Sequence, residues 1–338
     1  MPWPAQSHYV ANVDRECGAL VTNAPLSSLI SNGAAQMILV FGSINIDLVA
    51  RVVSLPRAGE TVLSPRYEKV CGGKGANQAV AAARVSIPGR IAMVASIGDD
   101  AFGHAARDNL AVNGIANDLV STCAEPTACA FIAVDQNGEN AITVASGANL
   151  SLLASTVPEA MLHRGVIAVL QMEVPFEQSL LVARRARVAG GRVLWNFAPA
   201  PPHFAAADLA NLIATTDIFV VNEHEAIAAA AVLGLVTADF AEAGAYLSGC
   251  GCLCIVTAGA RGAIAFHSGG PRETAGAAPI TPVDTTGAGD TFVGILASGL
   301  DEGLAFASAL NRACRGASLA CLAVGAQSSM PTREELGL

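Results

Sequence analysis

Strand-like and helix-like segments alternate through the second half of the chain, and this order constrains the fold more than any other feature. Short apolar runs typical of buried strands lie at residues 166–171, 192–195, 218–221 and 253–257, with longer helical stretches between them. Parallel strands need crossover connections, which are usually helices. The order therefore predicts an α/β fold with a mostly parallel sheet covered on both faces. Apolar residues make up 52% of the chain, enough for two covered faces.

Polar residues follow the carboxyl ends of these expected strands. Glu173 and Asn196 come after the first two, the segment 222–225 after the third, and the turn 258–262 after the fourth. Carboxyl ends of parallel strands meet at one edge of a sheet, where open α/β sheets bind ligands. Loops on rigid elements at that edge are the expected active site.

The stretch 284–292 combines three small residues with an acidic residue at the start of a helical segment. Gly287, Ala288 and Gly289 stand directly before Asp290. Small residues at a helix start let backbone N–H groups converge on an anion, and the helix dipole adds to the attraction. A phosphate would repel the carboxylate unless that carboxylate takes a proton from a hydroxyl attacking the phosphate. Two readings stay open from these residues: Asp290 is a base beside an anion hole, or it is the N-cap of the helix.

A second glycine loop, residues 71–83, runs into an Ala-rich helix. Its glycine spacing fits neither a P-loop nor a dinucleotide fingerprint. Gly73 would let a ligand approach the backbone, and Asn77 projects from the first turn. Upstream, Asn45 and Asp47 are two residues apart and share one face of an expected strand, where they could grip vicinal hydroxyls. A half-exposed edge strand is the alternative for that segment.

Asn222 and Glu225 are three residues apart and share one helix face. Their oxygens suit Mg²⁺, which keeps several waters and takes one or two protein carboxylates. A capping arrangement at the helix start is the alternative.

The nine cysteines do not form the pattern of a disulfide scaffold, because they are few for this length and odd in number. Cys250, Cys252 and Cys254 alternate, which would place them on one face of a strand. No second ligand pair follows at zinc-site spacing. We interpret them as small buried side chains of a reduced, cytoplasmic protein.

The net charge of −9, without a basic run, argues against nucleic acid and anionic membranes as partners. No apolar run is long enough to cross a bilayer. Residues 1–36 lack a clear period and a secretory or transit pattern, so we expect a disordered leader and a domain that begins near Met37.

Several blocks in order resemble the PfkB family of sugar and nucleoside kinases, and its ribokinase branch most closely. The strongest are residues 42–47 (Gly-Ser-Ile-Asn-Ile-Asp), 72–82 and 284–292, and weaker ones are 56–62, 147–149, 171–173, 222–225 and 325–327. The resemblance covers residues 37–335. It implies a ribokinase-like three-layer α/β/α fold with a mostly parallel central sheet and a small β-sheet lid.

The expected lid combines extended pieces near 44–70 with a hairpin at 128–145. An Asn-Gly turn between two alternating segments indicates that hairpin. A lid edge could also pair with a second copy of the chain, giving a homodimer.

The resemblance implies a role for each matched residue. Asp290 is the implied base, with Gly287, Ala288 and Gly289 as the anion hole. The implied sugar-facing residues are Asn45, Asp47, Gly73, Lys74, Asn77 and Glu173. Asn222 and Glu225 would organise Mg²⁺ and its waters, and Thr257, Gly259, Gly262 and Cys314 would surround the nucleotide. Asp284, Thr286 and Ser329, near Gly325, would hold a monovalent cation such as K⁺.

The implied activity is transfer of the γ-phosphoryl group of ATP to a primary hydroxyl, with D-ribose as the expected sugar and ribose 5-phosphate as the product. Two alternatives are a family member acting on fructose, a keto-deoxy sugar acid or a nucleoside, and a non-catalytic sugar-binding regulator. The chain departs from the family pattern at Ile295, where many members have Ala or Gly. It also departs at Cys314, where relatives often carry His or Asn near the adenine.

Overall fold

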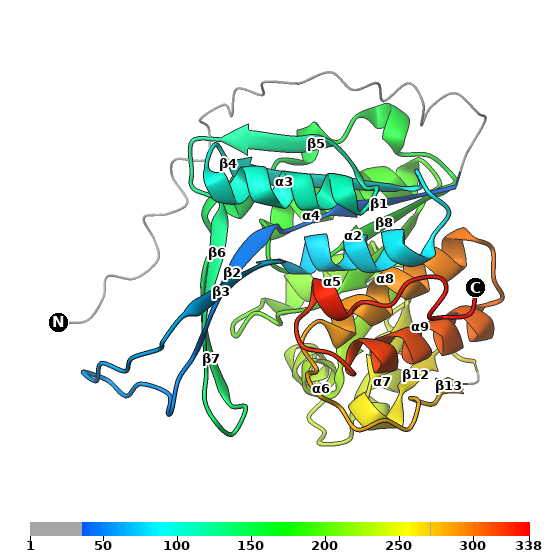
Figure 1. Cartoon of the computed structure of the whole chain (residues 1–338). Coiled ribbons are helices and arrows are strands. Elements are labelled where there is room, and N and C mark those ends of the chain that lie inside the picture. Colours follow the sequence, from blue (N-terminus) through cyan, green and yellow to red (C-terminus); the bar gives the residue numbers. More distant parts are fainter. Residues whose placement is uncertain (1–35, 271) are drawn as a thin grey trace.

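The computed structural model describes residues 36–270 and 272–338, which form two β-sheets and their covering helices (Figure 1). The expected leader, apart from Gln36, lies outside the described residues. No helix within the described part is long and apolar enough to cross a membrane.

The larger sheet has nine strands in the order β13-β12-β11-β10-β9-β8-β1-β4-β5. The strands from β11 to β5 run parallel, and β12 and β13 add an antiparallel edge. Their bounds are β1 Met37–Phe41, β4 Ile91–Gly98, β5 Ala116–Cys123, β8 Val166–Leu170, β9 Arg192–Asn196, β10 Ile218–Asn222, β11 Leu253–Thr257, β12 Ala263–Phe266 and β13 Arg272–Ala275. This confirms the predicted mostly parallel sheet.

Helices cover both faces of this sheet, as the three-layer prediction required. Ile38 and Val40 of β1 point into one apolar cluster, while Leu39 and Phe41 point into the other. The first cluster contains side chains of α2 (Lys74–Val85), α3 (Ala101–Val112), α8 (Ala288–Asp301) and α9 (Phe306–Ala320). The second contains side chains of α4 (Phe176–Val188), α5 (Ala206–Ala214), α6 (Glu223–Val232) and α7 (Phe240–Gly249).

The small sheet has four strands in the order β3-β2-β6-β7 and extends away from the main sheet (Figure 1). Its strands are β2 Asn45–Arg51, β3 Tyr67–Gly72, β6 Ala128–Val134 and β7 Asn140–Ala145. The expected hairpin is present as the antiparallel pair β6–β7. The expected extended pieces near 44–70 are β2 and β3. Between them Pro65 cannot donate to a ladder, and Ser64 Oγ lies within hydrogen-bond distance of the carbonyls of Arg51 and Arg66.

The interpretation of three cysteines on one strand face is wrong, because only Cys254 of the three lies on a strand. Cys250 is the exposed C-cap residue of α7, whereas Cys252 and Cys254 are buried. The strand begins only at Leu253, so the alternation in the sequence spans a helix end and a turn. Every cysteine in the described ranges is a free thiol.

Glycines let α8 pack closely against α2 on one side and α9 on the other. This packing holds in place the helix that begins within the 284–292 motif. A Cβ atom at Gly294 would lie 2.4 Å from the carbonyl oxygen of Gln78 on α2, and one at Gly299 would lie 3.0 Å from Cβ of Ala309 on α9. α8 therefore lies nearly backbone to backbone with α2.

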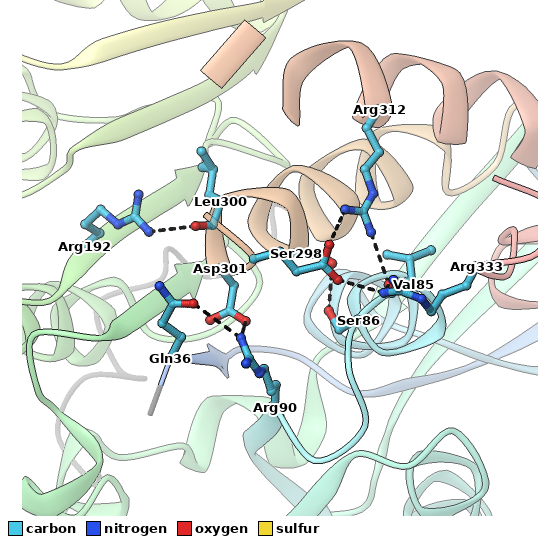
Figure 2. A network of polar contacts seen from close by, with 11 residues as sticks. Gln36, Val85, Ser86, Arg90, Arg192, Ser298, Leu300, Asp301, Arg312 and Arg333 are labelled. Atoms are coloured by element: carbon cyan, nitrogen blue, oxygen red, sulfur yellow. Dashed lines mark hydrogen bonds and ion pairs between the residues drawn. The ribbon is translucent and has the colours of Figure 1, made fainter. Parts of the chain in front are cut away.

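Polar contacts anchor the carboxyl end of α8 (Figure 2). Arg192 donates to the carbonyl of Leu300 at 3.2 Å, Arg90 pairs with Asp301 at 3.1 Å, and Ser86 donates to Ser298 at 2.8 Å. Cations at a helix carboxyl end stabilise its unpaired carbonyls and its dipole. With this end tied, the amino end of α8 is held at the carboxyl edge of the sheet.

Candidate active site

Asp290 lies on the first turn of α8 and is 6% exposed. Asn77 Nδ2 donates to its Oδ2 at 2.9 Å, and Gln78 Nε2 donates to its Oδ1 at 3.0 Å. The N-cap of α8 is Gly287, so the capping alternative for Asp290 is wrong. The carboxylate is directed at the first turn of α2, where the two glycine motifs of the sequence meet.

The two residues that donate to Asp290, Asn77 and Gln78, are themselves hydrogen-bonded to further side-chain amides. Gln78 also donates to Asn196 Oδ1 at 3.0 Å, and Gln171 donates to Gln78 Oε1 at 2.7 Å. On the other side Gln327 Nε2 donates to Asn77 Oδ1 at 3.0 Å. No role was predicted from the sequence for these glutamines, and Asn196 was expected only as a polar residue at the edge of the sheet. Gln78 directly follows Asn77 in the glycine-loop block, and Asn196 ends a strand at the site edge, so both positions carried a signal.

The bend before α8 is held in place by Asp284. Its Oδ1 accepts from Thr286 N at 2.9 Å and Thr286 Oγ1 at 2.6 Å, and its Oδ2 accepts from Gly325 N at 2.9 Å. Burial opposes ionisation, but these hydrogen bonds together hold the pKa of Asp284 below its usual value. Ser329 donates to the carbonyls of Gly325 and Ala326. Asp284, Thr286 and Ser329 thus gather around one loop, as the resemblance implied.

Gly287 adopts a left-handed conformation that this bend requires. Its φ is +74°, and a Cβ atom there would lie 2.9 Å from Cβ of Ala326. A Cβ atom at Gly289 would meet nothing within 4 Å. The amides of Gly287, Ala288 and Gly289 stand at the amino end of α8, where the helix dipole favours an anion.

A group of charged side chains surrounds Asp290. The carboxylate of Asp290 is the largest influence raising the pKa of Lys74, and Glu173 and Glu225 add to it. Burial raises the pKa of Asp47 to about 6, and the charges of Glu173 and Asp290 contribute. Such mutual influence places all five side chains in one region.

The side chains of Asp47 and Lys74 have no hydrogen-bond or ion-pair partner among residues 36–270 and 272–338, unlike their neighbours. Glu173 Oε2 accepts from Ser43 Oγ at 2.6 Å and from the backbone N–H of Lys74 at 2.9 Å. Asn45 Oδ1 accepts from Asn149 Nδ2 at 2.8 Å. Polar groups without protein partners at a cleft are available to a ligand.

Gly73 shows why this loop needs a glycine. Its φ is +88°, and a Cβ atom would lie 2.7 Å from the backbone nitrogen of Asn45. The loop and strand β2 therefore approach backbone to backbone. This contact brings the two halves of the expected sugar site together.

Asn222 and Glu225 form the capping box that the sequence analysis kept as the alternative. Asn222 Oδ1 accepts from Glu225 N, and Glu225 Oε2 accepts from Asn222 N, both at 2.8 Å. Burial raises the pKa of Glu225, and the charge of Asp290 adds to this. One oxygen of Glu225 is not used by the cap. No group of three or more metal-binding side chains occurs in the described part of the chain.

A cavity of about 410 Å³ opens beside the bend. Among its lining residues are the four predicted nucleotide-binding positions and two of the bend: Thr257, Gly259, Gly262, Cys314, Ala288 and Gly289. The sequence analysis missed the stretch 277–280, which supplies an apolar wall, and Ser318. That stretch has no regular secondary structure or pattern to mark it.

The two departures from the family pattern are accommodated by local packing. Ile295 is fully buried, and a Cβ atom at Gly316 would lie 2.2 Å from its Cδ1, so Gly316 on α9 leaves the room that Ile295 fills. Cys314 Sγ donates to the carbonyl of Ala275 at 3.5 Å, and burial raises its pKa to about 11. Cys314 is thus a neutral thiol in the wall of the cavity.

Comparisons with known proteins agree with this arrangement. The family described as "pfkB family carbohydrate kinase" matches residues 35–333. The ribokinase of Lactococcus lactis is 36% identical over 301 residues, covering 88% of this chain and 94% of that protein. The crystal structure of Thermotoga maritima ribokinase superposes with a TM-score of 0.82 at 31% identity, covering 89% of this chain and 98% of that one. The structure of Arabidopsis thaliana ribokinase complexed with ribose and ATP gives a TM-score of 0.76 at 30% identity, covering 89% and 97%.

Proposed function

Because the chain belongs to the pfkB family of carbohydrate kinases, we propose that it transfers the γ-phosphoryl group of ATP to the primary hydroxyl of D-ribose. The products are ribose 5-phosphate and ADP. The family establishes an ATP-dependent carbohydrate kinase. The choice of ribose rests on the ribokinases among its relatives, at 36% identity for the one from Lactococcus lactis.

One observation carries the proposal. The carboxylate of Asp290 lies one residue beyond the Gly287–Gly289 bend, between the cavity that Gly289 lines and the first turn of α2, which carries Asn77. A kinase needs its base at the junction of the nucleotide and acceptor sites, within reach of the attacking hydroxyl. The 284–292 motif provides that position.

Asp290 accepts the proton of the sugar hydroxyl as its oxygen bonds to the γ-phosphorus. The bond from the γ-phosphorus to the bridging oxygen breaks, and ADP leaves with that oxygen. A positioned base contributes about 10²–10⁴ in rate. The bend amides hold the transferring group, and removing one such donor costs about 3–4 kcal/mol in the barrier. Positioning and charge stabilisation are the main demands of phosphoryl transfer.

The sugar site lies where Asp47 and Lys74 lack protein partners. Ring hydroxyls donate to Asp47 and accept from Lys74, while Asn77, Glu173 and Asn45 complete the polar wall around Gly73. Hydrogen bonds to charged groups are worth about 1.5–3 kcal/mol each. A polyol with several neighbouring hydroxyls satisfies this set better than a ligand with few.

The adenine of ATP fits the apolar cavity. The cavity volume of about 410 Å³ is within the range of small-molecule sites. Gly259 and Gly262 have positive φ values of 52° and 84°, and they let the turn after β11 approach the nucleotide. Thr257 and Cys314 stand at its walls.

Mg²⁺ and a monovalent cation fit the oxygen donors of two positions. Glu225 keeps one carboxylate oxygen outside its cap, which matches a magnesium ion held by phosphates and waters and steered by one carboxylate. Asp284 and Ser329 present oxygen donors around the loop behind the bend, and these fit a hard cation such as K⁺. Bound there, the cations would neutralise charge on the phosphates and would make the bend more rigid.

The kinase domain spans residues 37–335, with the small sheet as a lid. Closure of the lid excludes water, which competes with the sugar as acceptor. Exposed apolar side chains on the lid, Phe131, Ile142 and Val144, support a homodimer through this sheet.

The rate of ADP release with a panel of acceptors tests the proposal. The panel contains D-ribose, 2-deoxyribose, D-fructose and adenosine, each with ATP and Mg²⁺. The proposal expects the highest kcat/KM for D-ribose and a product phosphorylated on its primary hydroxyl. A higher value for fructose or the nucleoside would move the assignment to another member of the family, and no sugar-dependent ADP release would refute it.

A further inference from the structure

We infer that Gln78 is a positioning residue for the proposed base, because it sets which way the carboxylate of Asp290 faces. The inference rests on the proposed function of Asp290. Gln78 is fully buried on α2 and has all three of its polar contacts to side chains from other elements. It does not line the cavity beside the bend.

The orientation of the Gln78 amide follows from a main-chain carbonyl in the sheet. The carbonyl oxygen of Val220 can only accept, so Asn196 must present its NH₂ group there, at 3.3 Å. The oxygen of Asn196 then faces Gln78 and requires a donor, which is Gln78 Nε2 at 3.0 Å. The second hydrogen of that NH₂ group is directed at Asp290 Oδ1. The backbone of β10 thereby fixes an N–H donor on the base.

The opposite side of Gln78 agrees with this orientation. Gln171 Nε2 donates to Gln78 Oε1 at 2.7 Å, while Oε1 of Gln171 is buried without a partner among the described residues, so Gln171 follows the orientation of Gln78 and does not set it. The contact of Asn77 with Oδ2 is oriented in the same way by Gln327. Neither contact offers an acceptor for a carboxyl proton. Both donors hold the carboxylate plane and leave its remaining lone pairs for the sugar hydroxyl.

Removing the donor therefore misplaces the base without removing a sugar contact. A displacement of about 1 Å at a reacting group costs about 10²-fold in rate. We expect Gln78→Leu to lower kcat by about 10- to 100-fold, with the KM for ribose changed by less than about threefold. A matched control is Gln171→Leu, since Gln171 is equally buried and belongs to the same chain of amides but does not contact Asp290. Its kcat should fall by less than about fivefold.

Gln78→Glu supplies a readout that a purely structural role would not change. Two carboxyl groups in hydrogen-bond contact share one proton and lose it only at raised pH. While the shared proton stays on residue 78, that residue still donates to Asp290. The charged neighbours of Asp290 are Lys74, Asp47, Glu173 and Glu225, and they are the same in both proteins. We expect kcat of Gln78→Glu to fall with rising pH over a range in which the wild-type kcat is flat.

The test is kcat and KM for ribose between about pH 5.5 and 9.5, with ribose binding by calorimetry and far-UV circular dichroism for each variant. The inference is supported by a selective loss of kcat in Gln78→Leu together with the alkaline decline in Gln78→Glu. If Gln78→Leu does not fold, the pH profile of Gln78→Glu decides. Wild-type kcat in Gln78→Leu, or a wild-type profile in Gln78→Glu, overturns it. A wild-type enzyme that phosphorylates no sugar would instead refute the proposed function.

Discussion

Asp47 is held in a position that costs stability, and replacing it with Asn should make the protein more stable but bind sugar less well. Its carboxylate is mostly buried beside Glu173 and Asp290, and it accepts no hydrogen bond from residues 36–270 or 272–338. A neutral amide of the same shape removes the buried charge and its repulsion with Glu173 and Asp290.

The size of the effect follows from the pKa of Asp47. Burial, with Glu173 and Asp290, raises it from 3.8 to about 6. Two pKa units correspond to about 3 kcal/mol, and halving this for solvent screening of a partly exposed group leaves about 1.5 kcal/mol. A raised pKa means that the folded protein binds the proton more tightly than the unfolded chain. Stability from this group is therefore fully present below about pH 4 and is lost as the pH rises through about 6.

Thermal unfolding at two pH values measures the change. At about pH 7.5 we expect Asp47→Asn to melt about 2 °C above the wild type, since 1.5 kcal/mol is spread over the unfolding entropy of 338 residues. At about pH 4.5 the folded wild type has mostly bound the proton but the unfolded chain has not, so the gap should shrink to about a third of its value at pH 7.5. The KM for ribose should rise about 10- to 100-fold, because a hydrogen bond to a charged acceptor is lost.

Glu68→Gln is the matched control, because it removes the same charge from a half-exposed position on the same sheet. It should leave the melting temperature within about 1 °C at both pH values. A melting temperature of Asp47→Asn at or below that of the wild type at pH 7.5, or the same increase at both pH values, would refute the reasoning.

Three further predictions concern the bend, the cavity and the far end of α8. Gly287→Ala should lose about 1–2 kcal/mol of stability and at least tenfold in kcat, because φ of Gly287 is +74° and the added Cβ would press on Ala326. Gly289→Ala, with open space at its Cβ, should melt at the wild-type temperature. Equal kcat values in the two variants would count against the anion hole. GTP should replace ATP with a loss in kcat/KM of less than about 10²-fold, since the side chains of Thr257, Cys314 and Ser318 in the cavity wall already donate their hydrogens to carbonyls. A loss near 10⁴-fold would show a specific reader of the base. Glu302→Ala should cost about 3 kcal/mol in urea unfolding because it leaves buried Arg312 without its 2.6 Å partner, while an unchanged midpoint would contradict that role.

Local patterns predicted the elements of the fold well because each pattern has a local cause. The start of α3 has such a local cause, because Asp100 is its N-cap and the side chain of Asp100 accepts from Gly103 N. Strands 166–171 and 253–257 matched β8 and β11 closely, since a buried parallel strand reads as one apolar run. The wrong prediction for Cys250 has the same origin, because cysteines alternate in the sequence across the end of α7 and the alternation itself does not mark where the helix stops and the strand begins.

Contacts within the site depended on pairings that no local pattern contains. Asp290 and Gln78 are 212 residues apart, and their contact exists because α8 packs against α2 through Gly294. The sequence motifs indicated the segments that became α2 and α8, but they did not indicate that these two helices pack side by side. Gln78 was missed for this reason, and Asn196 was predicted only at the sheet edge without its partner: a buried amide becomes informative only when its partners are known.

Turnover and sugar binding by Asp290→Asn, measured on the same preparation, test the central claim most directly. The amide keeps the size of the carboxylate but cannot take the proton of the sugar hydroxyl. We expect a folded protein that binds ribose within about tenfold of the wild type and has lost 10²-fold or more of kcat. An Asp290→Asn variant that keeps more than a few per cent of the wild-type rate would contradict the assignment of Asp290 as the base.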